Sequence, residues 1–339
     1  MIKVSILFIC YNHSKYVAEA LRSVLFQEYV NYELVICDDA SNDNTRAIIV
    51  DELKNCPPHV NVVWASQNTN IGLLANFNQG MAACSGDVIF AAAGDDISML
   101  ERVSTTMEVF SNNPRCMLVS SNYQKIDDTG QLLAPTSKRN VDATIIYGIN
   151  PTEIYAGVRI PGATAAYRAS LRDVFGPLNI GKHAEDGGYW VRALLAGEIH
   201  FISKPLVKYR VHGANLSNYA KVSDTSQARQ RYLRVMLNKQ HDWRQYGKDI
   251  SCAVNHALIS DQLAHHLRAI VTRDRELIRL KRFSIAVAPW RLWLAAAWRV
   301  MGCYSYSYAR LWKILSNDFR VRVSRRKRAR RWKQKFSIH

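Results

Sequence analysis

Two pairs of adjacent aspartates each follow an apolar run of strand length. Asp38-Asp39 comes directly after residues 32–37, and Asp95-Asp96 comes after residues 87–93 and one glycine. Like charges held this close cost free energy unless a cation or hydrogen bonds compensate them. Carboxylate, water and phosphate oxygens are ligands that Mg²⁺ and Mn²⁺ accept. Together the pairs predict a site for a divalent cation that carries a diphosphate.

A third acidic motif, Glu185-Asp186, opens a helical pattern that continues through Leu194 and Leu195. Acids in a first helical turn contribute about 0.3–1 kcal/mol at an exposed site, which is one explanation for the motif. The other is a general base, a carboxylate held near a reacting hydroxyl group. Helix capping is likewise an alternative for the residues after the first aspartate pair, but it does not account for Asp39.

These motifs lie on an alternating pattern of strands and helices. Apolar runs cover residues 4–10, 32–37, 60–65 and 87–93, and residues at helical spacing follow each run. Such alternation predicts an α/β fold with a mostly parallel sheet and helices on both faces. Because the carboxyl ends of parallel strands share the edge where ligands bind, both aspartate pairs are expected there. A dinucleotide-type glycine fingerprint and a Walker A sequence are absent, which argues against a nicotinamide site or a P-loop.

In the remainder of the chain the sequence pattern changes twice. Strand-like segments at 116–123, 144–147, 199–202 and 206–210 surround a loop at 160–164 and a helix near 186–196. No linker-like composition separates them from the first half, so residues 1–220 are expected to form one catalytic domain. Residues 221–282 are helical in pattern and predict a helical extension. Residues 283–339 are expected to form one or two amphipathic aromatic helices and a basic tail.

Charge and cysteine content restrict the class of protein. The net charge is +17, and residues 281–339 hold sixteen lysines and arginines against one acid, so the rest is close to neutral. The amino terminus enters a strand pattern without a secretory signal, which predicts a cytoplasmic protein. Seven cysteines without a Cys-x-x-Cys pair argue against a disulfide framework and a zinc site.

The carboxyl-terminal arm, residues 283–339, carries a stripe of aromatic and apolar residues at helical spacing between Trp290 and Leu315. Its internal arginines and the lack of an uncharged run of about 20 residues argue against a membrane span. Three interpretations stay open. The arm packs on the catalytic domain or on a second copy in a homodimer, it lies on a membrane surface with its basic tail near anionic lipid, or it binds nucleic acid. The membrane surface is favoured and nucleic acid is the least favoured.

The order of these motifs resembles that of family 2 glycosyltransferases of the GT-A fold, over roughly residues 3–217. The residues that carry the resemblance are Tyr11-Asn12, the acidic stretch 38–45, Asn70-x-Gly72 with Asn76, Gly94-Asp95-Asp96, Glu185-Asp186 with Trp190 and Arg192, and finally residues 209–217. Many members have a further aspartate where this chain has Ala93. That departure concentrates the expected metal role on Asp96.

The resemblance implies roles for individual residues. Those expected to bind the nucleotide donor are Tyr11 and Asp39 at the base, Asp95 at the ribose, and also Asn70 and Asn76. Asp96 would hold the Mn²⁺ or Mg²⁺ that bridges the diphosphate, and His212 would help to hold the metal or the diphosphate. A loop histidine bonded to backbone is the alternative for His212. Asp186, with Glu185 beside it, would deprotonate the acceptor hydroxyl.

The resemblance further implies an inverting enzyme of cell-envelope polysaccharide synthesis. It would move a sugar from a nucleotide-diphosphate sugar, with UDP favoured, to a glycan or lipid-linked acceptor at the inner face of the plasma membrane. One alternative is a nucleotidyltransferase on a similar sheet, but the expected Gly-rich basic loop is missing from residues 10–13. The other is a catalytically inactive membrane-binding adaptor, supported only by Ala93.

Overall fold

The computed structural model describes residues 2–133, 145–147, 162–179, 185–213, 215 and 242–272. The chain divides into two units, 1–278 and 279–339, and all described residues belong to the first. The strands are β1 (Val4–Cys10), β2 (Tyr32–Asp38), β3 (Asn61–Trp64), β4 (Val88–Ala93), β5 (Ile97–Ser98), β6 (Cys116–Ile126), β7 (Ile145–Tyr147), β8 (Ala166–Arg168) and β9 (Glu198–Arg210). The helices are α1 (Val17–Leu25), α2 (Thr45–Glu52), α3 (Leu73–Ala83), α4 (Arg102–Asn112), α5 (Ser170–Phe175) and α6 (Asp186–Ala196), with short 3-10 turns η1 (Leu53–Asn55) and η2 (Gly162–Thr164). Two further helices span residues 242–255 and 261–272.

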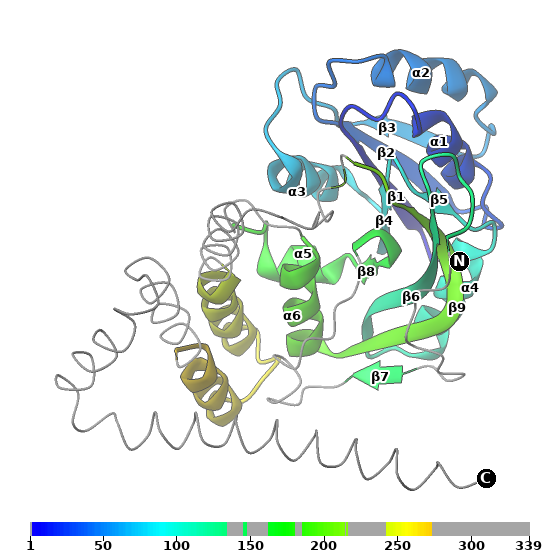
Figure 1. The fold of residues 1–339 in the computed structure, drawn as a ribbon. Helices are drawn as coiled ribbons and strands as arrows, with labels where there is room; N and C mark the ends of the chain where they lie inside the picture. The colour runs from blue at the N-terminus through cyan, green and yellow to red at the C-terminus, as the bar shows by residue number, and fades with distance from the viewer. Residues whose placement is uncertain are drawn as a thin grey trace, which may run out of the picture. The chain divides into compact units, whose positions relative to one another are not determined.

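The strands form one mixed sheet in the order β3-β2-β1-β4-β8-β6-β9-β5, and β7 pairs with β9 (Figure 1). The first four strands are parallel, and Ile9 of β1 lies opposite both Cys37 of β2 and Ala93 of β4. Strand β8 is antiparallel to β4 and to β6. The predicted α/β sheet flanked by helices is confirmed, and its parallel half carries both aspartate pairs at one edge.

Alternating side chains of the parallel strands enter two separate cores. Leu7 and its neighbours on one face pack with α3, α6 and the helices within 242–272. Phe8 and its neighbours on the other face pack with α1, α2 and α4. Fully burying a Leu or Phe side chain contributes about 1.5–3 kcal/mol, so covering both faces stabilises the sheet that positions the site.

The described part of the predicted helical extension shares its core with the sheet. Ile250, Ala253 and Leu267 are buried in the same cluster as Leu7 and Tyr189. The helices at 242–272 therefore belong to the same packed unit as the catalytic half. No helix within the described ranges is both long enough and apolar enough to span a membrane. The arm predicted at 283–339 lies outside the described residues.

One pair of predicted strands proved to be a single strand. Residues 199–202 and 206–210 were expected separately because Pro205 and polar neighbours interrupt the apolar pattern, but both lie in β9. Pro205 pairs with Asn122 of β6 where the register shifts on both sides. Proline has no N–H for a ladder hydrogen bond, and such an irregularity tolerates it.

Ala40 is expected to strain the turn after β2, because its φ is +56°. The left-handed conformation costs a residue with a Cβ about 1–2 kcal/mol, part of which the freedom of an unfolded glycine offsets. Ala40→Gly should therefore raise the free energy of unfolding by about 0.5–1 kcal/mol, measured in urea. The matched control is Ala47→Gly at an exposed site in α2, which should lower stability by about 1 kcal/mol. Destabilisation by both substitutions would contradict the strain at Ala40.

Candidate active site

Asp39 lies at the carboxyl end of β2 and is buried. Its Oδ1 accepts the N–H of Ile71 at 2.8 Å, and its Oδ2 accepts the N–H of Gly72 at 2.9 Å. Just before α2, Asp43 accepts the N–H of Thr45 at 2.9 Å, while Asn44 at the N-cap position makes no side-chain cap hydrogen bond. Burial opposes ionisation of Asp43, but the hydrogen bonds outweigh it and lower its pKa to about 2. Asp39 thus fixes the loop at 70–72 to the sheet edge, which capping does not explain.

Tyr11 and Asn70 lie on chain segments next to Asp39. The carbonyl of Cys10 accepts the N–H of Asp39 at 3.0 Å, which holds the exit of β1 against the exit of β2. Tyr11 follows this contact and is 39% exposed. Asn70 is exposed and precedes the loop amides that Asp39 binds. The structure therefore groups these three predicted nucleotide-binding residues on neighbouring segments of one edge.

Asn76, also expected to bind the donor, is buried next to this edge. It lies in α3 with no exposed surface, and its Nδ2 donates to the carbonyl of Cys37 at 3.0 Å. The contact holds α3 against the end of β2. Asn76 therefore supports the end of β2, which carries Asp38 and leads into Asp39.

The second aspartate pair follows β4 and contacts the end of β9. Asp95 Oδ2 lies 2.9 Å from His212 Nε2. Asp96 Oδ1 accepts the backbone N–H of Arg210 at 2.8 Å, and Arg210 Nε donates to the carbonyl of Asp95 at 3.0 Å. The structure thus places Asp95, expected at the ribose, beside Asp96 and His212, which are expected at the metal and diphosphate.

Arg210 is a site residue to which the sequence assigned no role. Its buried guanidinium lies 5.0 Å from the ring centre of Tyr16 and donates to Glu19 at 2.6 Å. The ring of Tyr16 is in turn 4.8 Å from the ring of His212. The motif at 209–217 contained Arg210, but only the fold shows that it joins β9 to α1 beside Asp95.

The surroundings of the Asp96 carboxyl group shift its pKa. Burial raises its pKa well above the usual range, Asp95 adds to the shift, and Arg210 and Arg102 oppose it. Arg102 is itself buried and donates to the carbonyl of Ala91 at 2.8 Å. The buried Asp96 carboxylate is next to the Asp95 carboxylate, so a cation bound beside them would stabilise the pair.

The donor set is compatible with Mn²⁺ or Mg²⁺. Within the described ranges, no three carboxylate, imidazole or thiol side chains are placed so as to hold a metal ion by themselves. Mg²⁺, however, is usually bound by one or two carboxylates together with water and substrate phosphates. Asp95 and Asp96, with His212 beside them, fit a metal that shares its coordination with a diphosphate.

Glu185 and Asp186 stand at the start of α6, beneath the turn η2. Asp186 Oδ1 accepts the N–H of Gly187 at 2.7 Å. Gly162 of η2 packs so closely that a Cβ there would lie 2.4 Å from Glu185 Oε1. Because β8 runs antiparallel to β4, the turn that precedes β8 lies at the carboxyl edge of β4. The third acidic motif therefore faces the same edge of the sheet as the aspartate pairs.

Burial raises the pKa of Glu185 to about 7, and the neighbouring Asp186 adds to the shift. The phenol of Tyr167 lies in the same environment, where burial and then Glu185 and Asp186 raise its pKa. Tyr167 is fully buried, and its hydroxyl has no hydrogen-bond partner among the described residues. The half-buried pair thus lies beside a buried phenol, and a carboxyl group with a raised pKa is suited to acid–base chemistry.

Glu185→Gln is expected to change how stability depends on pH. The folded chain holds the Glu185 proton with a pKa of about 7 against an ordinary value of 4.5, so its contribution is complete below pH 4.5 and is lost as the pH rises through 7. Relative to the Gln variant, the wild type should lose on the order of 1–3 kcal/mol across this range in urea unfolding. Glu108→Gln, at an exposed site on α4, is the control. Parallel pH curves for wild type and Glu185→Gln would contradict the buried carboxyl.

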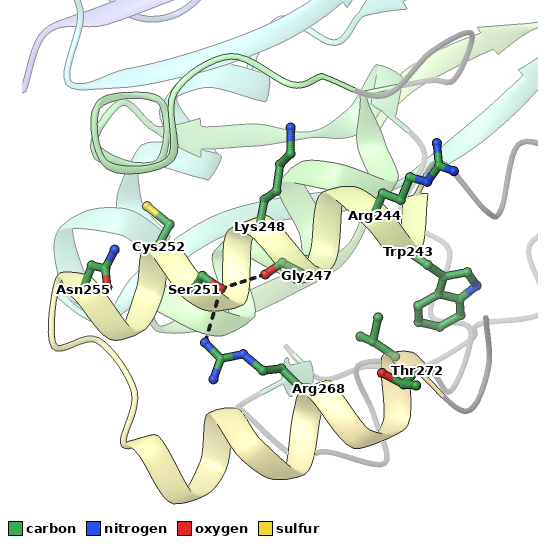
Figure 2. Close-up of a pocket in the computed structure, with 10 residues that line it drawn as sticks. Trp243, Arg244, Gly247, Lys248, Ser251, Cys252, Asn255, Arg268 and Thr272 are labelled. Carbon is green, nitrogen blue, oxygen red and sulfur yellow. Dashed lines mark hydrogen bonds between the residues drawn. The ribbon is translucent and has the colours of Figure 1, made fainter. Parts of the chain in front are cut away.

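A separate groove lies between the helices at 242–255 and 261–272 (Figure 2). Its volume is about 750 Å³, and its lining includes Arg244, Lys248 and Arg268 but no acidic residue. Arg268 Nη2 donates to Ser251 Oγ at 3.2 Å across the groove. The groove has no acidic residue in its lining, whereas three acidic motifs meet at the sheet edge, so the sheet edge is the candidate active site.

Comparisons with known proteins identify the family of the chain. Residues 5–175 match the protein family Glycosyl transferase family 2. An uncharacterized glycosyltransferase of Nostoc sp. is 25% identical over 247 residues, which are 70% of this chain and 74% of the relative. The poly-beta-1,6-N-acetyl-D-glucosamine synthase of Staphylococcus epidermidis is 28% identical over 199 residues, 58% of this chain and 44% of the relative.

Solved structures show the same architecture. The structure of S. aureus TarS 1-349 in complex with UDP-GlcNAc is 22% identical with a TM-score of 0.57, over 84% of this chain and 76% of that one. The mannosyltransferase PcManGT from Pyrobaculum calidifontis, in complex with GDP-Man and Mn²⁺, is 15% identical with a TM-score of 0.50, over 92% of this chain and 83% of that one. Both are similar to this chain in fold. The family match covers half of the chain and the fold is the expected GT-A arrangement, so the chain belongs to glycosyl transferase family 2 and is a glycosyltransferase.

Proposed function

We propose that this glycosyltransferase moves a sugar from a nucleotide-diphosphate sugar to a hydroxyl group of a glycan or lipid-linked acceptor, inverting the anomeric carbon. The observation that carries the proposal is that Asp95-Asp96 and Glu185-Asp186 face one edge of the sheet. The first pair suits a donor diphosphate and the second suits an acceptor hydroxyl. The UDP-GlcNAc bound to TarS supports UDP as the favoured nucleotide.

On the donor side, the nucleotide is bound by Tyr11, Asp39 and Asn70, and its ribose is bound by Asp95. Asn76 serves them indirectly by holding the end of β2. Asp96 and His212 would hold Mn²⁺ or Mg²⁺. The metal, when bound, supplies positive charge against the charge of the leaving diphosphate. The Mn²⁺ bound together with GDP-Man in PcManGT supports this assignment.

On the acceptor side, Asp186 removes the proton of the attacking hydroxyl group. The hydroxyl oxygen bonds to the anomeric carbon as the bond from that carbon to the diphosphate oxygen breaks. A single displacement inverts the configuration and needs no covalent sugar–enzyme intermediate. Because burial raises the pKa of Glu185 to about 7, Glu185 is partly protonated near neutral pH, which weakens its repulsion of the Asp186 charge.

The cellular setting of the proposal is polysaccharide synthesis at the inner face of the plasma membrane. The poly-beta-1,6-N-acetyl-D-glucosamine synthase among the relatives supports a polysaccharide product. The concentration of lysine and arginine in 281–339 supports attraction to anionic lipid, with protein contacts by the arm as the alternative. Sedimentation with vesicles tests this role: removal of residues 284–339 should abolish binding, and unchanged binding would contradict it.

A panel of nucleotide sugars tests the proposed reaction. Purified protein is incubated with UDP-, GDP- and dTDP-linked sugars, with Mn²⁺, with Mg²⁺, or with EDTA, and released nucleoside diphosphate is measured. We expect release from one nucleotide class that requires a metal, and weakened metal-dependent binding of that donor in Asp96→Ala. Failure to bind or cleave any donor would favour the inactive adaptor instead.

A further inference from the structure

His13 follows β1 and faces the second aspartate pair. Ile9 of β1 lies opposite Ala93 of β4, so the chain that leaves β1 passes beside residues 94–96. His13 Nε2 lies 3.9 Å from Asp95 Oδ2, the same oxygen that lies 2.9 Å from His212 Nε2. Two imidazole rings therefore flank one carboxylate oxygen at the centre of the site.

The ring of His13 is held in place by its own segment and by Gly94. Its backbone N–H donates to Thr45 Oγ1 at 2.8 Å, and its carbonyl accepts the N–H of Val17 at 2.8 Å, at the start of α1. Gly94 approaches so closely that a Cβ there would lie 2.8 Å from His13 Nδ1. The orientation of Nε2 toward Asp95 is thus built into the fold.

The surroundings of the ring assign its proton to Nε2. Nδ1 is buried and has no hydrogen-bond partner in the part of the chain that the structure describes. A proton there would be a buried donor without an acceptor, which costs about 1–3 kcal/mol. A histidine that binds a metal usually donates its other N–H to a partner, and Nδ1 of His13 has none among the described residues. His13 is therefore suited to donate a hydrogen bond from Nε2 rather than to ligate a metal.

The Nε2–H group of His13 is accessible, and its interaction with Asp95 is weak. A separation of 3.9 Å from Asp95 is too long for a hydrogen bond, and the side chain of His13 is 21% exposed. The Nε2–H of His13 can therefore reach a ligand that binds beside Asp95.

We propose that His13 binds the diphosphate of the donor, its Nε2–H donating a hydrogen bond to a phosphate oxygen. This inference rests on the proposed function, since it concerns the same donor. It assigns to His13 a direct contact with the ligand, beside the pair formed by Asp95 and His212.

Binding of UDP and of uridine to the full chain in the presence of Mn²⁺ tests the proposal. His13→Phe keeps a ring against Gly94 but removes both nitrogens, and His13→Gln restores an N–H donor. We expect His13→Phe to weaken UDP binding by about tenfold or more, because hydrogen bonds to charged groups contribute about 1.5–3 kcal/mol. Uridine binding should stay unchanged, and His13→Gln should bind UDP nearly as well as wild type. GDP and guanosine are measured in parallel.

Several outcomes would overturn the assignment. Unchanged UDP binding by His13→Phe, equal losses for UDP and uridine, or a Gln variant as weak as the Phe variant each contradict a phosphate contact. Circular dichroism establishes that the variants are folded, and His59→Phe, before β3 at the opposite edge of the sheet, is the matched control. If the wild type binds neither diphosphate, the proposed function fails; if it binds one and His13→Phe binds it equally, only the role of His13 fails.

Discussion

Replacing Asp186 with asparagine is expected to lower sugar transfer by about a hundredfold to ten-thousandfold while leaving donor binding close to that of wild type. The amide has nearly the same shape as the carboxylate, and its oxygen can still accept the N–H of Gly187 that Asp186 accepts at 2.7 Å. It cannot accept a proton from the acceptor hydroxyl. The loss should therefore fall on the rate of transfer and not on the affinity for the donor.

The measurement pairs a transfer assay with calorimetric titration of the donor. Asp173→Asn is the matched control, since Asp173 lies on α5 with a side chain 57% exposed and paired to Arg172. It should leave both transfer and binding unchanged. Transfer at the wild-type rate by Asp186→Asn would show that Asp186 is not the base, and loss of donor binding would place it on the donor side instead.

Removing the carboxylate of Asp249 is expected to lower the free energy of unfolding by about 3–5 kcal/mol. Asp249 pairs with Arg192 of α6 at 3.2 Å, and the side chains are 2% and 0% exposed. Arg192 also donates to three successive carbonyls at the end of α5, those of Phe175, Gly176 and Pro177. Asp249→Ala would leave a buried guanidinium with no counter-charge among the residues that the structure describes.

Urea unfolding compares Asp249→Ala with Asp261→Ala, an exposed acid on the helix at 261–272 that should change stability by less than about 0.5 kcal/mol. Arg192 lies on the helix that begins with Asp186, so the Asp249 variant should also transfer sugar more slowly at temperatures where it remains folded. Equal stability of the two variants would mean that the helix at 242–255 does not support α6 as the packing indicates.

Three strands of the parallel half, β1, β2 and β4, were predictable because they are buried on both faces. Such strands appear as continuous apolar runs, and β1, β2 and β4 follow the expected ranges within a residue. Their polar ends then mark the ligand-binding edge, which is why Asp39, Asp95 and Asp96 could be placed before the fold was known. The fused strand β9 was not predictable, because its continuity depends on the irregular pairing of Pro205 with β6.

The contacts inside the site were harder to predict from the sequence. His13 and Asp95 are far apart in the chain, and only the pairing of β1 with β4 brings them to 3.9 Å. Likewise, nothing in the local pattern around Asp249 indicates that it neutralises Arg192. Asn76 illustrates the opposite case, since its place in a family motif implied a ligand contact, whereas the structure places its side chain in the core against β2.

The anomeric configuration of the first transfer product tests the central proposal most directly. The reaction starts with a donor of defined configuration, and proton NMR measures the coupling constant of the anomeric proton in the product. The spectrum is recorded before the anomers can interconvert spontaneously. A single displacement assisted by Asp186 predicts a product of inverted configuration. A product that retains the configuration of the donor would contradict the mechanism, because retention requires a second displacement or a different path.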